Sequence, residues 1–220
     1  MLEAYQFVSR HPEMLAEWIV DHLWISLVAI GIGAIFGVTT GIFIAGKGRE
    51  RTAEVVLYFA EIMMTVPSLA LFGLLMLLLS RMGLSAIGFL PAVITLIAYG
   101  QLPILRNTCT AIRHVDPAII EAGRGMGMNE RQLLFKIKLP LALPVIMAGL
   151  RNAMVLIIGI AAIAALIGAG GLGVPIFRGL RNARMDLIII GGVSVSVLAL
   201  LVDGLMALLE RWITPKGLKG

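Results

Sequence analysis

Three ionisable residues lie inside runs that are otherwise almost entirely apolar. They are Glu61, Arg151 and Asp203. A charged side chain at membrane depth is costly and commonly marks a polar path, a gate or an ion pair. Two interpretations remain open: these residues line or gate a path, or Glu61 and Asp203 lie close to a membrane surface while Arg151 forms a static pair. In either case we expect Arg151 to pair with an acidic residue of another helix.

Two prolines in the same apolar runs are further candidates for gating. Pro67 and Pro103 each remove a backbone N–H and can therefore bend a helix. The segment Ile167–Gly173, with the sequence IGAGGLG, can adopt turns that other residues avoid. A hinge and a simple turn are both compatible with it.

The residues needed for enzyme chemistry or metal binding are not arranged for it. His11, His22 and His114 are far apart, and no pair of them has metal-ligand spacing. The chain also contains no phosphate-binding loop of the GxxxxGK[ST] type. We therefore expect no catalytic residue, no metal and no cofactor on this chain, and no ATP binding by it.

The composition indicates an integral membrane protein. Of 220 residues, 59% are hydrophobic and 14% are charged, whereas a soluble domain is nearer a quarter charged. Five apolar runs could each span a bilayer of about 30 Å as a helix. We predict an all-α protein with a single domain over residues 1–220 and spans at about 23–46, 55–80, 88–108, 141–167 and 187–209. Backbone groups in lipid must pair within their own segment, which favours helices.

The distribution of basic residues predicts the orientation. Five spans place the termini on opposite sides, and most lysines and arginines fall in segments that share a side with the C-terminus. The positive-inside rule then places the N-terminus outside and the C-terminus in the cytoplasm, although the arginines between 178 and 184 argue the other way. The net charge of +5 therefore belongs to membrane loops, and we expect no nucleic-acid partner.

The first predicted span carries glycines four residues apart. Gly33, Gly37 and Gly41 share one helix face, where another helix can come close. The partner helix could belong to a second subunit or to the same chain.

The most polar stretch between the spans is EAGRGMGMNERQLLFKIKLP, residues 121–140. It lies in a cytoplasmic loop at about 113–140 and is predicted to form two short helices. Asp116 and Pro117 suit the start of the first, and Gly127 suits the turn after it. Asn129 and Gln132 resemble a capping box for the second. We expect Pro140 to end that helix and begin the fourth span.

This stretch resembles the coupling loop of the membrane subunits of bacterial ABC importers. The family pattern is Glu-Ala-Ala, three residues, Gly, nine residues, Ile, any residue and Leu-Pro. The chain matches it in register at six positions: Glu121, Ala122, Gly127, Ile137, Leu139 and Pro140. It departs at Gly123, where Ala is usual, which could loosen the first helix. The resemblance implies the type I ABC importer permease fold and a loop that docks on a separate ATPase subunit, which would bind ATP and Mg.

Further motifs resemble the osmoprotectant branch of these importers. They are TVPSLAL at 65–71, LPILRNTCTAI at 102–112 and VDPAIIEAG at 115–123. The resemblance implies a permease of the bacterial inner membrane for a solute such as glycine betaine, choline or carnitine. It also implies a second permease subunit, identical or paralogous, an extracytoplasmic substrate-binding protein and contact with lipid. A methionine-type importer is the alternative within the class, and a small channel or scaffold is the alternative outside it.

Overall fold

The computed structural model describes residues 2–213 and consists of helices joined by short turns. Within this range no strand occurs. The helices are α1 (Leu2–Arg10), α2 (Pro12–Ile44), α3 (Glu50–Thr65), α4 (Ser68–Arg81), α5 (Phe89–Arg113), α6 (Pro117–Gly125), α7 (Glu130–Leu133), α8 (Leu139–Ala164), α9 (Gly173–Arg181) and α10 (Met185–Ile213). A π-helical turn, η1 (Leu134–Lys138), precedes α8, and a 3₁₀ turn, η2 (Ala165–Ile167), follows it.

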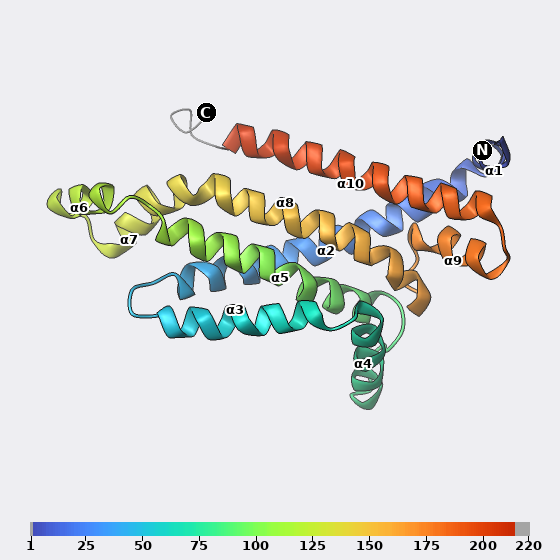
Figure 1. Cartoon of the computed structure of the whole chain (residues 1–220), viewed down its shortest axis with the longest axis horizontal. Coiled ribbons are helices and arrows are strands. Elements are labelled where there is room, and N and C mark those ends of the chain that lie inside the picture. Colours follow the sequence, from blue (N-terminus) through green and yellow to red (C-terminus); the bar gives the residue numbers. More distant parts are fainter. Residues whose placement is uncertain (1, 214–220) are drawn as a thin grey trace.

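The long helices α2, α5, α8 and α10 run along the long axis of the molecule (Figure 1). One end of the bundle carries α6 and α7, and we call it the hairpin end. The opposite end carries α1 and α9. The two ends of the described chain lie at opposite ends of the bundle, as an odd number of spans requires. Four helices are long and apolar enough to cross a membrane, and the bent pair α3–α4 would make a fifth. The predicted all-α architecture with about five spans is confirmed.

The second predicted span, 55–80, is not one helix. The chain breaks between α3 and α4, whose axes differ by 101°, and α4 projects away from the bundle (Figure 1). The cause is local: Pro67 has no N–H for a helix, and Val66 before it is extended, with φ −67° and ψ 126°. The bend predicted at Pro67 is present, but it divides the span into two helices.

Other helices extend beyond the predicted spans. α2 begins at Pro12 rather than near residue 23, because proline suits the first helical turn and the charged residues that follow do not interrupt the helix. α5 continues to Arg113 and α10 to Ile213. The predicted limits followed the uncharged residues, whereas a helix also continues through charged residues near a membrane surface.

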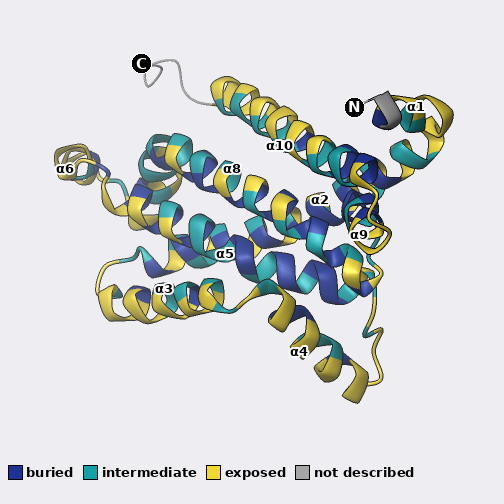
Figure 2. Ribbon diagram, turned by 45° about the vertical axis from the view of Figure 1, so that its right-hand side comes forward, coloured by how far each residue is buried: buried dark blue, intermediate teal, exposed yellow. Residues whose placement is uncertain are grey.

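The core lies where α2, α5 and α8 meet, seen as the dark blue region of Figure 2. The glycine face of α2 packs on α5 within this chain. A methyl group added at Gly37 would lie 2.6 Å from Ile104 Cγ2, and one at Gly41 would lie 2.7 Å from Thr108 Cβ. The glycines therefore permit close helix packing inside the subunit rather than between subunits.

Candidate coupling loop and charged sites

The loop at the hairpin end contains two helices that are capped as the sequence predicts. The Asp116 carboxylate accepts a hydrogen bond from the Ala118 N–H at 2.8 Å, with Pro117 in the first turn of α6. Gly127 follows α6 with φ +81°, a left-handed conformation that favours glycine. Asn129 and Gln132 then form a reciprocal capping box, with both hydrogen bonds at 2.9 Å. These local predictions are confirmed.

The predicted end of the second helix at Pro140 is wrong. α7, η1 and α8 follow one another without a break, so one helical rod runs over Glu130–Ile167. In η1 the Leu139 N–H bonds to the Leu134 carbonyl, one residue further back than in an α-helix. This wider turn accommodates Pro140, which has no N–H and whose ring would clash with the carbonyl four residues earlier. The loop is therefore mechanically continuous with α8.

The two arms of the hairpin pack closely on each other. A methyl group at Gly123 would lie 2.7 Å from Leu133 Cδ2 and 2.8 Å from Ile137 Cδ1. The glycine that departs from the family pattern thus allows a close approach of α6 to α7 and η1, and does not simply loosen the first helix. An ion pair of 2.7 Å between Arg124 and Glu130 also joins the two arms.

The hairpin buries one apolar set and exposes another. Leu133 is fully buried, and Leu134 packs against a cluster that includes Ile112 and Ile146. By contrast, Met126 is 71% exposed and Phe135 is 65% exposed. The loop is thus fixed to its own bundle, while its outer surface keeps large apolar side chains uncovered.

The six residues that carry the family pattern all belong to this hairpin or to its junction with α8. Glu121 and Ala122 are exposed on α6, and Gly127 is exposed in the turn. The other three, Ile137, Leu139 and Pro140, are half-buried where η1 meets α8. The structure therefore gathers both ends of the pattern into one hairpin, and their role in coupling stays a prediction.

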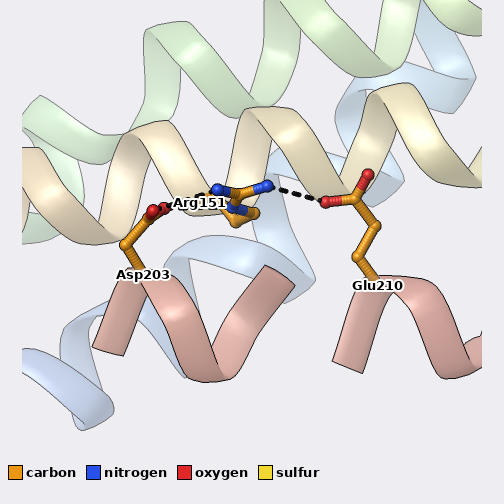
Figure 3. A network of polar contacts seen from close by, with 3 residues as sticks. All are labelled: Arg151, Asp203 and Glu210. Atoms are coloured by element: carbon orange, nitrogen blue, oxygen red, sulfur yellow. Dashed lines mark hydrogen bonds and ion pairs between the residues drawn. The ribbon is translucent and has the colours of Figure 1, made fainter. Parts of the chain in front are cut away.

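Arg151 joins α8 to α10 through two acidic residues (Figure 3). Its Nε donates to Asp203 Oδ1 and its Nη2 to Asp203 Oδ2, both at 3.0 Å. Its Nη1 donates to Glu210 Oε2 at 3.0 Å. The predicted pairing of Arg151 with an acid of another helix is confirmed. Sequence analysis missed Glu210, although its spacing from Asp203 places both on one face of α10.

Glu61 has a partner that the sequence analysis counted only as a loop charge. The Arg106 guanidinium on α5 donates to Glu61 on α3. The side chains are 53% and 44% exposed, respectively. The three candidate ionisable residues therefore fall into two separate sites, α3–α5 and α8–α10, and do not form one cluster.

The two prolines proposed for gating behave differently. At the break beside Pro67, the Tyr99 hydroxyl on α5 donates to the Val66 carbonyl and fixes the bend to the bundle. Pro103 lies inside α5, which is a single helix around it. The Asn107 side chain donates to the Pro103 carbonyl at 2.8 Å. A gate at either proline stays a prediction.

His22 forms a buried clamp that the sequence analysis did not predict. Its Nδ1 accepts a hydrogen bond from the Leu172 N–H at 3.2 Å, so its Nε2 carries the proton and donates to the Ile158 carbonyl at 3.0 Å. The clamp ties α2 to α8 and to the glycine-rich segment after it, in which Gly171 approaches the ring closely. In residues 2–213 no three His, Cys, Asp or Glu side chains are grouped so that they could hold a metal ion.

A comparison with protein families now identifies the class. Residues 18–215 match the model of the family described as binding-protein-dependent transport system inner membrane component. The chain belongs to this family.

Relatives of this permease carry osmoprotectant names. It is 42% identical over 218 residues to the osmoprotectant import permease protein OsmW of Salmonella typhimurium, covering 99% of this chain and 100% of that one. It is 41% identical over 200 residues to the glycine betaine/carnitine/choline transport system permease protein OpuCB of Bacillus subtilis, covering 91% and 88%.

Solved structures confirm the fold. The permease resembles a chain of the MetNI methionine ABC transporter in an inward-facing conformation, with a TM-score of 0.80 over 94% of this chain and 99% of that one. The sequence identity is 22%, so this likeness establishes the type I importer permease fold and not the solute.

Proposed function

We propose that the permease forms, with a second permease chain, the translocation pathway of an ATP-driven importer for a compatible solute such as glycine betaine, choline or carnitine. The observation that carries the proposal is the 42% identity to an osmoprotectant import permease over essentially the full length of both chains. A methionine-type solute has weaker support, because the likeness to the methionine transporter is one of fold at 21–22% identity.

The hairpin at residues 121–140 is the proposed docking element for an ATPase subunit, which would carry the ATP and Mg. Exposed Met126 and Phe135 on an otherwise polar hairpin supply the apolar contacts that a groove in a partner would bury. The proposal is supported further by the continuity of α7, η1 and α8, because a rigid rod transmits a displacement of the hairpin directly to the helix that carries Arg151.

The mechanism proposed is alternating access. Closure of two ATPase subunits would draw two hairpins together and open the α9 end of the bundle to a solute-loaded binding protein, and hydrolysis would reverse the change. The free energy for this exchange has to come from contacts that differ between the two states. The surface of the hairpin and the α3–α5 and α8–α10 ion pairs are the places where we expect such contacts to change.

Solute uptake tests the transport class. Cells lacking their own osmoprotectant uptake would express the permease with its ATPase and its binding protein, and uptake of radiolabelled glycine betaine, choline, carnitine and methionine would be measured. We expect permease-dependent uptake of at least one quaternary ammonium solute, and no competition by excess methionine. Uptake of methionine alone would favour the alternative solute. Ion conductance by the purified permease without ATP would favour a channel.

Co-purification tests the hairpin. Met126→Asp places a charge at a 71% exposed apolar position of the hairpin, and Met185→Asp does the same at a 69% exposed position at the opposite end. We expect the ATPase subunit to co-purify with the wild type and with Met185→Asp but to be lost with Met126→Asp. Equal recovery of the ATPase with both variants would overturn the docking proposal and leave the uptake result untouched.

A further inference from the structure

A groove at the hairpin end lies between the turn that joins α2 to α3 and the coupling hairpin. It encloses about 670 Å³. One wall is the last turn of α2 and the residues after it, and the other is α7 with η1. The groove is separate from both ion-pair sites and from the exposed face of the hairpin that carries Met126 and Phe135.

The rim of the groove is basic. Lys47, Arg49 and Lys138 line it together with a single acid, Glu130. Glu130 already pairs with Arg124 at 2.7 Å. Within residues 2–213 neither Lys47 nor Lys138 forms an ion pair, so two ammonium groups from different parts of the chain face the groove without a counter-ion.

Arg49 is held in place across this rim. Its Nη1 donates to the Phe43 carbonyl at 2.8 Å, and its guanidinium lies 3.7 Å from the centre of the Phe43 ring. Below the basic rim, the lining is apolar and includes Ile42, Ile112 and Leu134. The groove thus presents positive charge at its mouth and an apolar wall beneath it.

The position along the bundle matches the level of lipid headgroups. α2 ends at Ile44 and α8 begins at Leu139, so Lys47 and Lys138 lie where two apolar helices reach a membrane surface. Basic pockets between membrane helices at this level bind phosphate headgroups. An apolar wall continuing along α2 suits acyl chains, which a free anion does not have.

We infer that this groove binds the phosphate headgroup of an anionic phospholipid, with Lys47 and Lys138 contacting the phosphate and the acyl chains lying along α2. A bound lipid would touch the α2–α3 turn and η1 at once. It would therefore hold the coupling hairpin against the bundle at the point where the hairpin continues into α8. The inference depends on where the helices end, and it stands whichever solute is carried.

Native mass spectrometry of the full-length permease tests the site, with dioleoylphosphatidylglycerol or dioleoylphosphatidylcholine added to the detergent. The test variant is Lys47→Gln with Lys138→Gln. The control is Arg51→Gln with Lys136→Gln, which removes the same charge from exposed positions outside the groove. We expect retention of phosphatidylglycerol to fall about tenfold in the test variant, since each basic group contributes about 1 kcal/mol. The control should change it less than about twofold.

Further arms separate the other outcomes. Lys47→Arg with Lys138→Arg keeps both charges and should retain the lipid, which distinguishes lost charge from misfolding. Equal loss of lipid in the Gln variant and its control would overturn the inference in favour of non-specific charge. Retained lipid with loss of the ATPase subunit would make the groove a protein contact. Displacement of the lipid by millimolar inorganic phosphate would make it a free-anion site.

Discussion

Two charged contacts hold peripheral helices to the bundle, and they differ in how well the chain covers them. On the α8 side, Arg151 is 28% exposed and bonds to Asp203 and Glu210, which are 36% and 23% exposed. On the α3 side, Arg106 and Glu61 are 53% and 44% exposed and share one contact. The first site is largely closed by its own subunit, whereas the second presents a charged pair on the surface of a predicted membrane helix.

The difference indicates different roles for the same residue types. Glu61 lies about 16 Å along α3 from its first residue, and Arg151 about 18 Å along α8, at about 1.5 Å per residue, so both belong to the hairpin half of the bundle. Exposed charge at such depth has to be covered by water or by another chain. We therefore assign the α8–α10 site to holding α10 in place and propose that the α3–α5 face meets the pathway or the second subunit.

The largest expected effect comes from removing the central cation of the α8–α10 site. Arg151→Met leaves Asp203 and Glu210 facing the same space without a counter-ion. We expect the free energy of unfolding to fall by about 2 to 3 kcal/mol, somewhat less than for a fully buried pair because the site is partly exposed. Arg106→Met should lower it by less than about 1 kcal/mol. SDS titration in mixed micelles, followed by tryptophan fluorescence, measures both.

A triple variant checks the cause. Arg151→Met with Asp203→Asn and Glu210→Gln removes the whole charged set, and replacing a complete ion cluster is often nearly neutral. We expect most of the lost stability to return. A triple variant as unstable as Arg151→Met alone would show that packing of the arginine stem, rather than unpaired charge, supports α10.

The partners at these two sites explain what the sequence predicts and what it does not. The caps at Asp116 and Asn129 are local, so the residue types and their spacing suffice to predict them. Arg106 and Glu210 were missed as partners because those contacts join helices far apart in the chain. The bond between His22 and Leu172 was missed for the same reason, since nothing near residue 22 indicates which loop will fold over it.

Boundaries failed for a related reason. Apolar runs predict how many helices can span a membrane, and they did so here. They do not distinguish a bent helix from two helices at Pro67, or a helix end from a π-helical turn at Pro140. In both cases proline was identified correctly as a disruption, but its outcome depends on what packs around it. Tyr99 fixes the break at Val66, whereas the turn at Leu134–Lys138 continues the helix.

The next effect separates transport from stability. Glu61→Gln should reduce uptake of the transported solute by about tenfold, equivalent to about 1.4 kcal/mol, while changing the free energy of unfolding by less than about 0.5 kcal/mol. Glu54→Gln, on the same helix and exposed but not ion-paired, is the matched control and should transport normally. Wild-type uptake by Glu61→Gln would mean that the pair with Arg106 only joins α3 to α5, and the contrast between the two sites would then be one of degree.

The smallest effect concerns geometry at constant charge. Arg151 makes three hydrogen bonds to two carboxylates, and a lysine cannot reproduce the planar fork that holds Asp203. Arg151→Lys should therefore lower the free energy of unfolding by about 1 kcal/mol. Arg106 makes one contact to Glu61 at an exposed position, so Arg106→Lys should stay within about 0.3 kcal/mol of the wild type. Equal losses in the two lysine variants, in the same SDS titration, would mean that charge alone matters at both sites. The fixed geometry at Arg151 would then not be what holds α10 against α8.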